Sequence, residues 1–242
     1  MLTVITPTGD RAVPFGECVR YVNRSTLKPD LWIVVDDGRD KGTLAALGKA
    51  EVPVFYIHPE PMEGHSLNRN LRLAAKQVPA GSDVAIMEDD DYYPADYLAE
   101  TVKLLRQGAH CAGARKKHRY NLGSRCWRSY NGSHTLCTHS LAFDPAGWRH
   151  FCDRALFASD TCNLDTMLGT VWDAAAMGPR AHERTIPTHI VGWTCPGLRP
   201  GSTRGHHAQP GGRWTADPEG EILAAWIGAE DAARLLAIGG QK

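Results

Sequence analysis

The chain has 242 residues, 27 Lys and Arg, 27 Asp and Glu, and a formal net charge of zero. A neutral chain lacks the global positive field that draws a protein to nucleic acid or to an anionic membrane. The hydrophobic fraction of 43% is sufficient for a proper core, and the length fits one large domain or two small ones.

The cysteines and the apolar runs indicate the compartment. The seven cysteines are odd in number and form no Cys-x-x-Cys pair, which argues against a zinc site or a disulfide framework and for a reducing compartment. No apolar run approaches the roughly 20 residues that span a bilayer. The apolar residues 1–5 are too short for a signal-peptide core. We therefore expect a soluble, cytoplasmic protein.

Strands and helices alternate along roughly the first 110 residues. Short apolar runs bounded by turns are typical of strands that are buried on both faces of a parallel sheet. The alternation predicts an α/β fold in which helices cover both faces of a mostly parallel sheet. The predicted strands are 2–6, 31–35, 52–57 and 84–87, and the predicted helices begin at Pro14 or cover 43–49, 65–77 and 97–105.

The second half of the chain is less regular, and we find no internal repeat or linker in it. Its Gly- and Pro-rich stretch predicts a loop, and its last stretch predicts one or two amphipathic helices. The predicted elements are a strand at 136–143, helices at 148–151 and 160–172, a strand at 184–191, a loop at 196–212 and C-terminal helices within 218–238.

Two predicted strands end in acidic residues. The strand at 84–87 runs directly into Glu88-Asp89-Asp90-Asp91, and the strand at 31–35 ends in Asp36-Asp37-Gly38. Both ends should lie on the same sheet edge, where α/β proteins bind ligands. Four neighbouring carboxylates repel one another, so either some stay protonated or a cation neutralises them. Mg²⁺ or Mn²⁺ suits such oxygen ligands and keeps positions open for phosphate. The alternative is a solvated acidic loop.

The usual Gly-rich phosphate loops are missing after the first strand. Over residues 1–105 the sequence resembles the family 2 glycosyltransferases of the GT-A nucleotide-sugar fold. A phage-associated member of that family is compatible with the resemblance. The residues that carry the resemblance are Thr6-Pro7-Thr8, Val34-Val35-Asp36-Asp37-Gly38, Asn68-Arg69-Asn70, and Glu88-Asp89-Asp90-Asp91 with Leu98 seven residues further on.

The resemblance implies a donor-binding role for several residues. Asp36 or Asp37 would accept the N–H of a uracil ring, Arg69 would approach the diphosphate, and Asn70 would help to hold it or the adjacent loop. The residues that would line the nucleotide pocket are Thr6, Thr8 and Arg11.

The resemblance also implies roles for the acidic run. Glu88 or Asp89 would contact the ribose, and Asp90 or Asp91 would bind the metal. Glu88 stands where the family more often has Asp, which leaves the register of the motif open by one residue. On an extended chain Asp89 and Asp91 would share one side, and Glu88 and Asp90 the other.

Two further roles fall in the second half. A Gly-rich loop from 191 to 206 resembles one in related transferases that closes over the donor and supplies a metal-binding His, which implies His206, with His207 as the competitor. In related transferases an acidic residue below the reacting sugar begins a helix, which directs attention to 159–168. Asp160 is suited to cap that helix, which would lower its pKa. Asp165, next to apolar neighbours, is better suited as the general base.

A basic cluster covers residues 115–119, with Arg125 and Arg128 further on. Such a cluster is most often a solvated face. Interleaved with Tyr120, Trp127 and Tyr130, it could instead bind an acidic or aromatic acceptor, including single-stranded nucleic acid.

We therefore expect one GT-A-like domain over residues 1–242, with a nucleotide-sugar-binding half at 1–110, an acceptor and catalytic part at 111–215 and C-terminal helices at 216–242. The expected reaction is a metal-dependent, inverting transfer of the hexosyltransferase type, from a UDP-sugar to an acceptor hydroxyl. The acceptor stays open among a polysaccharide, a small molecule, a protein and hydroxylated bases in viral DNA.

Two alternatives belong to other classes. A nucleotidyltransferase also uses acids and Mg²⁺, but it usually carries a Gly-rich loop with Arg and Lys, of which Gly9-Asp10-Arg11 is a poor version. A nucleic-acid-binding module would use residues 115–128, and a steep salt dependence of binding would support it.

Overall fold

The computed structural model describes residues 1–39, 41–62, 66–114, 117–130, 140–157, 183–186, 190–194 and 213–239. The first half alternates strands and helices as the apolar runs predict. Its elements are β1 (Leu2–Thr8), α1 (Ala12–Arg24), β2 (Leu31–Asp36), α2 (Gly42–Leu47), β3 (Val54–Ile57), α3 (Leu67–Ala75), β4 (Asp83–Ile86), β5 (Asp91–Tyr92) and α4 (Tyr97–Arg106).

The described part of the second half is richer in strands. It contains β6 (Cys111–Ala114), β7 (Lys117–Asn121), β8 (Cys126–Tyr130), β9 (Ala142–Phe143), α5 (Pro145–Phe151), a π-helical turn η2 (Cys152–Leu156), β10 (Glu183–Ile186), β11 (Ile190–Thr194), β12 (Thr215–Ala216), α7 (Glu221–Ile227) and α8 (Ala229–Gly239).

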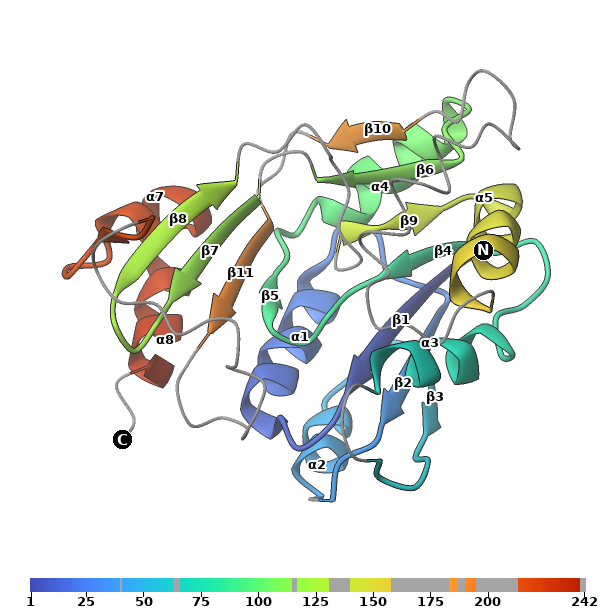
Figure 1. Cartoon of the computed structure of the whole chain (residues 1–242), viewed down its shortest axis with the longest axis horizontal. Coiled ribbons are helices and arrows are strands. Elements are labelled where there is room, and N and C mark those ends of the chain that lie inside the picture. Colours follow the sequence, from blue (N-terminus) through green and yellow to red (C-terminus); the bar gives the residue numbers. More distant parts are fainter. Residues whose placement is uncertain are drawn as a thin grey trace.

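The first sheet has seven strands in the order β10-β6-β9-β4-β1-β2-β3 (Figure 1). All its pairings are parallel except those of β9, which runs antiparallel between β4 and β6. Two apolar cores lie on its two faces, one with side chains of α1, α2 and α4, the other with side chains of α3 and α5. The expectation of a mostly parallel sheet with helices on both faces is confirmed.

The second sheet has five strands in the order β12-β8-β7-β11-β5. β5 comes from the chain directly after the acidic run, whereas its other four strands come from beyond residue 110. The first sheet in turn takes β6, β9 and β10 from beyond residue 110. The two halves expected from the sequence therefore interleave.

Two C-terminal helices, α7 and α8, are present, as the amphipathic pattern allows. Trp226 on α7 stacks on the His118 ring with the ring centroids 4.0 Å apart. On α8, Asp231 pairs with Arg24 of α1, and Arg234 Nε donates to Glu17 Oε2 at 2.9 Å. These contacts join the C-terminal helices to α1 and to the second sheet.

The second half corrects two strand predictions. The predicted strand at 136–143 is a strand only over Ala142–Phe143 within the described residues, since 131–139 lie outside them. The single strand predicted at 184–191 is wrong, because β10 and β11 belong to different sheets. Pro187, which has no N–H to donate, separates them in the sequence. The predicted helix at 160–172 lies outside the described residues.

No helix in the described part of the chain combines the length and the apolar character that a membrane crossing requires.

Candidate active site

The carboxyl ends of β1, β2 and β4 form one sheet edge, on which the two acidic strand ends meet (Figure 1). Thr8, the last residue of β1, lies beside Asp36, the last residue of β2. β4 pairs with the other side of β1 through Ile86 and Ile5. Because all three strands are parallel, the side chains that follow them lie on the same edge, as the sequence predicts.

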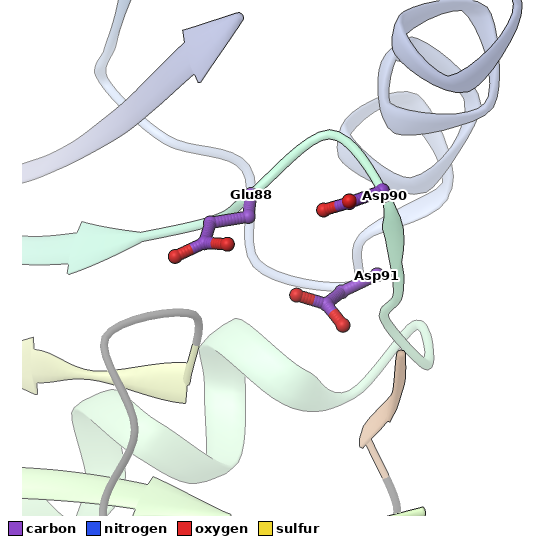
Figure 2. A group of neighbouring side chains, drawn as sticks. All are labelled: Glu88, Asp90 and Asp91. Atoms are coloured by element: carbon purple, nitrogen blue, oxygen red, sulfur yellow. The ribbon is translucent and has the colours of Figure 1, made fainter. Parts of the chain in front are cut away.

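The acidic run turns after β4. A turn at Asp89 and Asp90 lies between the end of β4 and β5, which begins at Asp91 in the second sheet. Carboxylate oxygens of Glu88, Asp90 and Asp91 consequently lie within 4.8 Å of one another, and Figure 2 shows them gathered around one space. The side-to-side alternation expected of an extended run therefore does not hold, and Glu88 joins the two predicted metal ligands.

Asp89 is not part of this group, and its side chain is buried, with 1% of the residue exposed. Its two carboxylate oxygens accept hydrogen bonds of 2.7 Å from Thr8 Oγ1 and Arg11 Nη1. Arg11 Nη1 also lies 3.0 Å from Asp90 Oδ2. Burial alone would lower the pKa of Arg11, but the neighbouring carboxylates raise it above its usual value. Thr8 and Arg11 thus bind the acidic turn through the buried carboxylate of Asp89.

The three converging carboxylates fit a divalent cation. Burial and the adjacent carboxylate of Asp90 raise the pKa of Asp91 well above its usual value, although Arg119 lowers it in part. Mg²⁺ and Mn²⁺ prefer oxygen ligands, and a cation in this space would compensate the excess negative charge. Glu88, Asp90 and Asp91 are therefore the described residues that could hold the metal.

The other strand end distinguishes Asp36 from Asp37. Asp36 Oδ1 accepts from the Gly38 backbone N–H and Asp36 Oδ2 from the Tyr56 hydroxyl, both at 2.9 Å. Asp37 is 3% exposed, and its Oδ2 accepts from Arg69 Nη2 at 3.3 Å. Asp37 Oδ1 is buried and has no hydrogen-bond partner among the described residues. Of the two acids, Asp37 has an oxygen left to accept an N–H.

Gly9 leaves room for this oxygen. A Cβ atom built at Gly9 would lie 2.2 Å from Asp37 Oδ1, closer than atoms can approach. Any side chain at this position would displace the Asp37 carboxylate, so the two loops after β1 and β2 can approach only because residue 9 is glycine.

Arg69 lies on the same edge, near the start of α3. Its Nη1 donates to the Glu60 carbonyl at 2.8 Å, and its Nε donates to Asn70 Oδ1 at 3.3 Å. Together with the contact to Asp37, these bonds orient the guanidinium group along the edge of β2. The structure thus brings Arg69, predicted to approach the diphosphate, into contact with Asp37, one of the two acids predicted to accept a uracil N–H.

Thr6 is placed differently from the expectation. It is fully buried, and its Oγ1 accepts a hydrogen bond of 2.9 Å from Trp32 Nε1 in the core beside α1. Its side chain supports the sheet and does not lie with Thr8 at the acidic turn. The predicted base candidates Asp160 and Asp165 and the candidate ligands His206 and His207 lie outside the described residues.

Three residues near the site were missed by the sequence reasoning. The Tyr93 hydroxyl accepts the Glu88 backbone N–H at 2.8 Å, and Tyr56 holds Asp36. Arg119 acts on Asp91 electrostatically. Tyr93 could have been found from the sequence, because it closely follows the acidic run. Arg119 could not, because it lies on another strand that is distant in the chain.

Three solved structures illustrate the folds to which this chain is similar. S. aureus TarS residues 1–349, in complex with UDP-GlcNAc, aligns with a TM-score of 0.60 and 16% identity over 98% of this chain and 66% of that chain. A mannosyltransferase from Pyrobaculum calidifontis, in complex with GDP-Man and Mn²⁺, aligns with a TM-score of 0.56 and 20% identity over 78% of this chain and 56% of that chain. The 4-diphosphocytidyl-2C-methyl-D-erythritol synthase of Anaerococcus prevotii aligns with a TM-score of 0.51 and 12% identity, over 78% and 87% of the two chains.

At these identities the likeness establishes the α/β fold that these structures share with this chain, and TarS and the mannosyltransferase are both longer than it. The chain spans less than two thirds of the length of either of them. None of the curated proteins compared with the chain matches it. Residues 3–166, well over half of the chain, match the family described as glycosyl transferase family 2. The chain therefore belongs to glycosyltransferase family 2.

Proposed function

We propose that the protein transfers a hexose from a UDP-sugar to an acceptor hydroxyl, with inversion at the anomeric carbon. The observation that carries the proposal is the meeting of two kinds of acid on one sheet edge. Asp37 offers a buried acceptor oxygen, and Glu88, Asp90 and Asp91 converge on one space. A nucleoside diphosphate has a base N–H for the first and phosphate charge that needs a cation at the second.

The donor would lie along the edge from β2 to β4. Asp37 Oδ1 would accept the uracil N–H, since a carboxylate oxygen only accepts hydrogen bonds. Arg69, already oriented by Asn70, would bind a phosphate oxygen, and Glu88 would lie toward the ribose. The UDP-GlcNAc complex of TarS supports a uridine donor, whereas the GDP-Man complex of the mannosyltransferase makes guanosine the competing base.

A metal would be held by Glu88, Asp90 and Asp91, and His206 is proposed to complete the set, with His207 as its competitor. The Mn²⁺ complex of the mannosyltransferase supports the assignment. Bound Mn²⁺ or Mg²⁺ supplies Lewis-acid stabilisation of negative charge on the diphosphate. Thr8 and Arg11 hold the turn that presents these acids, because both bind the buried Asp89.

We assign the general base to Asp165, with Asp160 as the alternative. The base would take the proton of the acceptor hydroxyl while its oxygen attacks the anomeric carbon from the face opposite the diphosphate. The new glycosidic C–O bond forms as the bond to the diphosphate oxygen breaks, which inverts the configuration. The acceptor belongs to one of four classes: a polysaccharide, a small molecule, a protein or a hydroxylated base in DNA.

Calorimetric titration of the protein with UDP, GDP and CDP, each with Mn²⁺ and with EDTA, tests the proposal. We expect UDP to bind most tightly and to lose affinity in EDTA. Equal UDP affinity in both buffers would remove the metal from the proposal, and a preference for GDP would replace the donor. The alternative is a nucleotidyltransferase on the fold that this chain shares with the synthase. Such an enzyme would bind a nucleoside triphosphate and release pyrophosphate.

A further inference from the structure

A row of residues crosses the second sheet and ends at the candidate metal site. Arg128 on β8 lies opposite Arg119 on β7, Arg119 lies beside Gly192 on β11, and Gly192 lies opposite Asp91 on β5. Residues that pair across strands project from the same face of a sheet. The two arginines therefore share the face of Asp91, and Gly192 between them and Asp91 has no side chain to separate the two groups.

The opposite face of the same strands is covered. His118 and Trp127 contact the Trp226 ring of α7, with centroid distances of 4.0 and 5.2 Å. Tyr120 is fully buried and its hydroxyl donates to Asp217. Tyr120 and Trp127 thus lie on the face that α7 covers, and the arginines project to the other side.

Arg119 and Arg128 repel each other, and the attraction between Arg119 and Asp91 offsets part of that repulsion. Like charges directly opposite each other on neighbouring strands destabilise a sheet. Burial and the positive charges of Arg119 and Arg213 lower the pKa of Arg128 below its usual value. The Arg128 guanidinium carbon also lies 4.7 Å from the centre of the Trp214 ring, which positions the group at the end of the row. An oxyanion between the guanidinium groups would relieve their repulsion.

We propose that this arginine row, formed by Arg119 and Arg128 with Arg213 beside them, binds a phosphate group of the acceptor. The inference rests on the proposed function, because it places the acceptor next to the donor site. Guanidinium groups match the geometry of phosphate with paired N–H donors. Arg119 lies two strand spacings, about 10 Å, from Asp91. The bound phosphate would then lie on the same sheet face as Asp91 of the candidate metal site.

A phosphorylated acceptor fits this face better than stacked bases do. Proteins that bind single-stranded nucleic acid present successive aromatic rings to the bases. Here Tyr120 and Trp127 lie on the covered face, and Trp214 contacts the arginine row. Two of the aromatic residues interleaved with the basic ones are therefore on the face opposite the arginines, whose positive charge suits a phosphate.

Calorimetry on protein saturated with UDP and Mg²⁺ tests the proposal, because the donor phosphates are then already in place. The probe is glycerol 3-phosphate, with glycerol and glycerate as matched compounds that carry no phosphate. We expect only glycerol 3-phosphate to bind. Arg119→Gln and Arg128→Gln should each weaken its binding about 10-fold or more, the usual effect of losing a charged hydrogen bond. The control Arg20→Gln removes the same charge from an exposed site on α1 and should change nothing.

Each result that contradicts the proposed phosphate site points to a different explanation. No binding of glycerol 3-phosphate, or equal binding of glycerate, would overturn a phosphate site. Tighter binding of an eight-residue oligothymidylate that is lost in Trp214→Ala would indicate single-stranded nucleic acid. If Arg128→Gln lowers the affinity for UDP as much as that for glycerol 3-phosphate, the row holds the donor. Absence of UDP binding by the unaltered protein would contradict the proposed function itself.

A second variant keeps the proposal testable if Arg128→Gln does not fold. The melting temperature of every variant is measured first, and if Arg128→Gln does not fold, Arg128→Lys replaces it. Lysine keeps the positive charge but cannot form the paired N–H contact, so we expect weaker binding of glycerol 3-phosphate with retained selectivity over glycerol. Binding equal to that of the unaltered protein would overturn a role for the Arg128 guanidinium group.

Discussion

The two acidic strand ends lie on one sheet edge, yet they compensate their charge in different ways. After β2, hydrogen-bond donors surround the acids, because Gly38 and Tyr56 occupy the Asp36 oxygens and Arg69 contacts Asp37. One buried oxygen of Asp37 is left over. After β4, Arg11 contacts two of four acids, and three carboxylates converge. The first end is therefore suited to accept a neutral N–H, and the second to bind a cation.

The contrast shows that acidic residues at a strand end do not define a metal site by themselves. What distinguishes the ends is the number of donors that the neighbouring elements supply. β3 contributes Tyr56 and α3 contributes Arg69 to the β2 end, whereas the acidic turn after β4 has Thr8 and Arg11 bound to Asp89. The experiments below test this division of roles, from the largest expected effect to the smallest.

The largest effect is expected at a residue of neither strand end. Asp165→Asn should reduce the rate of sugar transfer about 10²–10⁴-fold, the usual contribution of a general base. The affinity for UDP and the melting temperature should stay unchanged, because the proposed contacts to the metal and to the uracil ring come from the two strand ends. Asp160→Asn is the matched control. If Asp165→Asn stays active while folded Asp160→Asn is inactive, the two roles are reversed, and if both stay active the base lies elsewhere.

Replacing both Asp90 and Asp91 by Asn tests the cation-binding end. The affinity for UDP in Mn²⁺ should fall to the level measured in EDTA, a loss of about 100-fold, since changes outside the first ligands already cost about 10–100-fold. Calorimetry in both buffers measures it. Asp96→Asn, an exposed acid at the start of α4, should behave as the unaltered protein does. A double variant that still responds to Mn²⁺ would place the metal elsewhere.

Asp37→Asn tests the N–H-accepting end. Losing a hydrogen bond to a charged group should weaken UDP binding about 10-fold, and by the same factor in Mn²⁺ and in EDTA. Asp36→Asn should instead lower the melting temperature and spare UDP affinity, because both Asp36 oxygens hold protein groups. The opposite pattern, with Asp36→Asn impairing binding, would exchange the two assignments.

His206→Ala should weaken the metal-dependent part of UDP binding by up to about 10-fold, because three carboxylates would still hold the metal. The histidine is proposed as a ligand in a loop that closes over the donor. UDP and Mn²⁺ together should then reduce proteolytic cleavage within residues 196–210. Unchanged cleavage would argue against closure, and a loss of affinity in His207→Ala alone would identify the neighbouring histidine as the ligand.

The smallest effect is a gain of stability. Burial and the charge of Asp90 raise the pKa of folded Asp91 above its unfolded value, so its charged form costs stability at any pH above that folded pKa. In EDTA, Asp91→Asn should raise the melting temperature by a few degrees at neutral pH, roughly 2–4 °C per kcal/mol. The gain should shrink as the pH falls through the folded pKa, because the unaltered carboxyl then protonates. Thermal unfolding across pH 4–8 measures it, and a loss of stability in EDTA would show that Asp91 is already compensated.

Much of the first sheet could be predicted from the sequence. The apolar runs of β1, β2 and β4 are buried on both sides, so their composition alone marks them as strands. The apolar run of β3 also predicts a strand, although it lies at the sheet edge and is partly exposed. Helix periodicity located α1, α3 and α4 to within a few residues. The second sheet could not be predicted in the same way. Its β7 and β8 combine basic and aromatic residues, and this composition fits a loop or a nucleic-acid surface as well as a strand.

The sequence alone determined the order of the elements in the first half, the acids at two strand ends and the family, because each of these depends on residues close together in the chain. The tertiary structure decided which carboxylate oxygen meets which donor. The turn at Asp89 and Asp90 directed Glu88 toward the metal site, and the pairing of β5 with β11 aligned Asp91 with Arg119. Such contacts depend on the register between strands that are distant in sequence, and local preferences contain no information about that register.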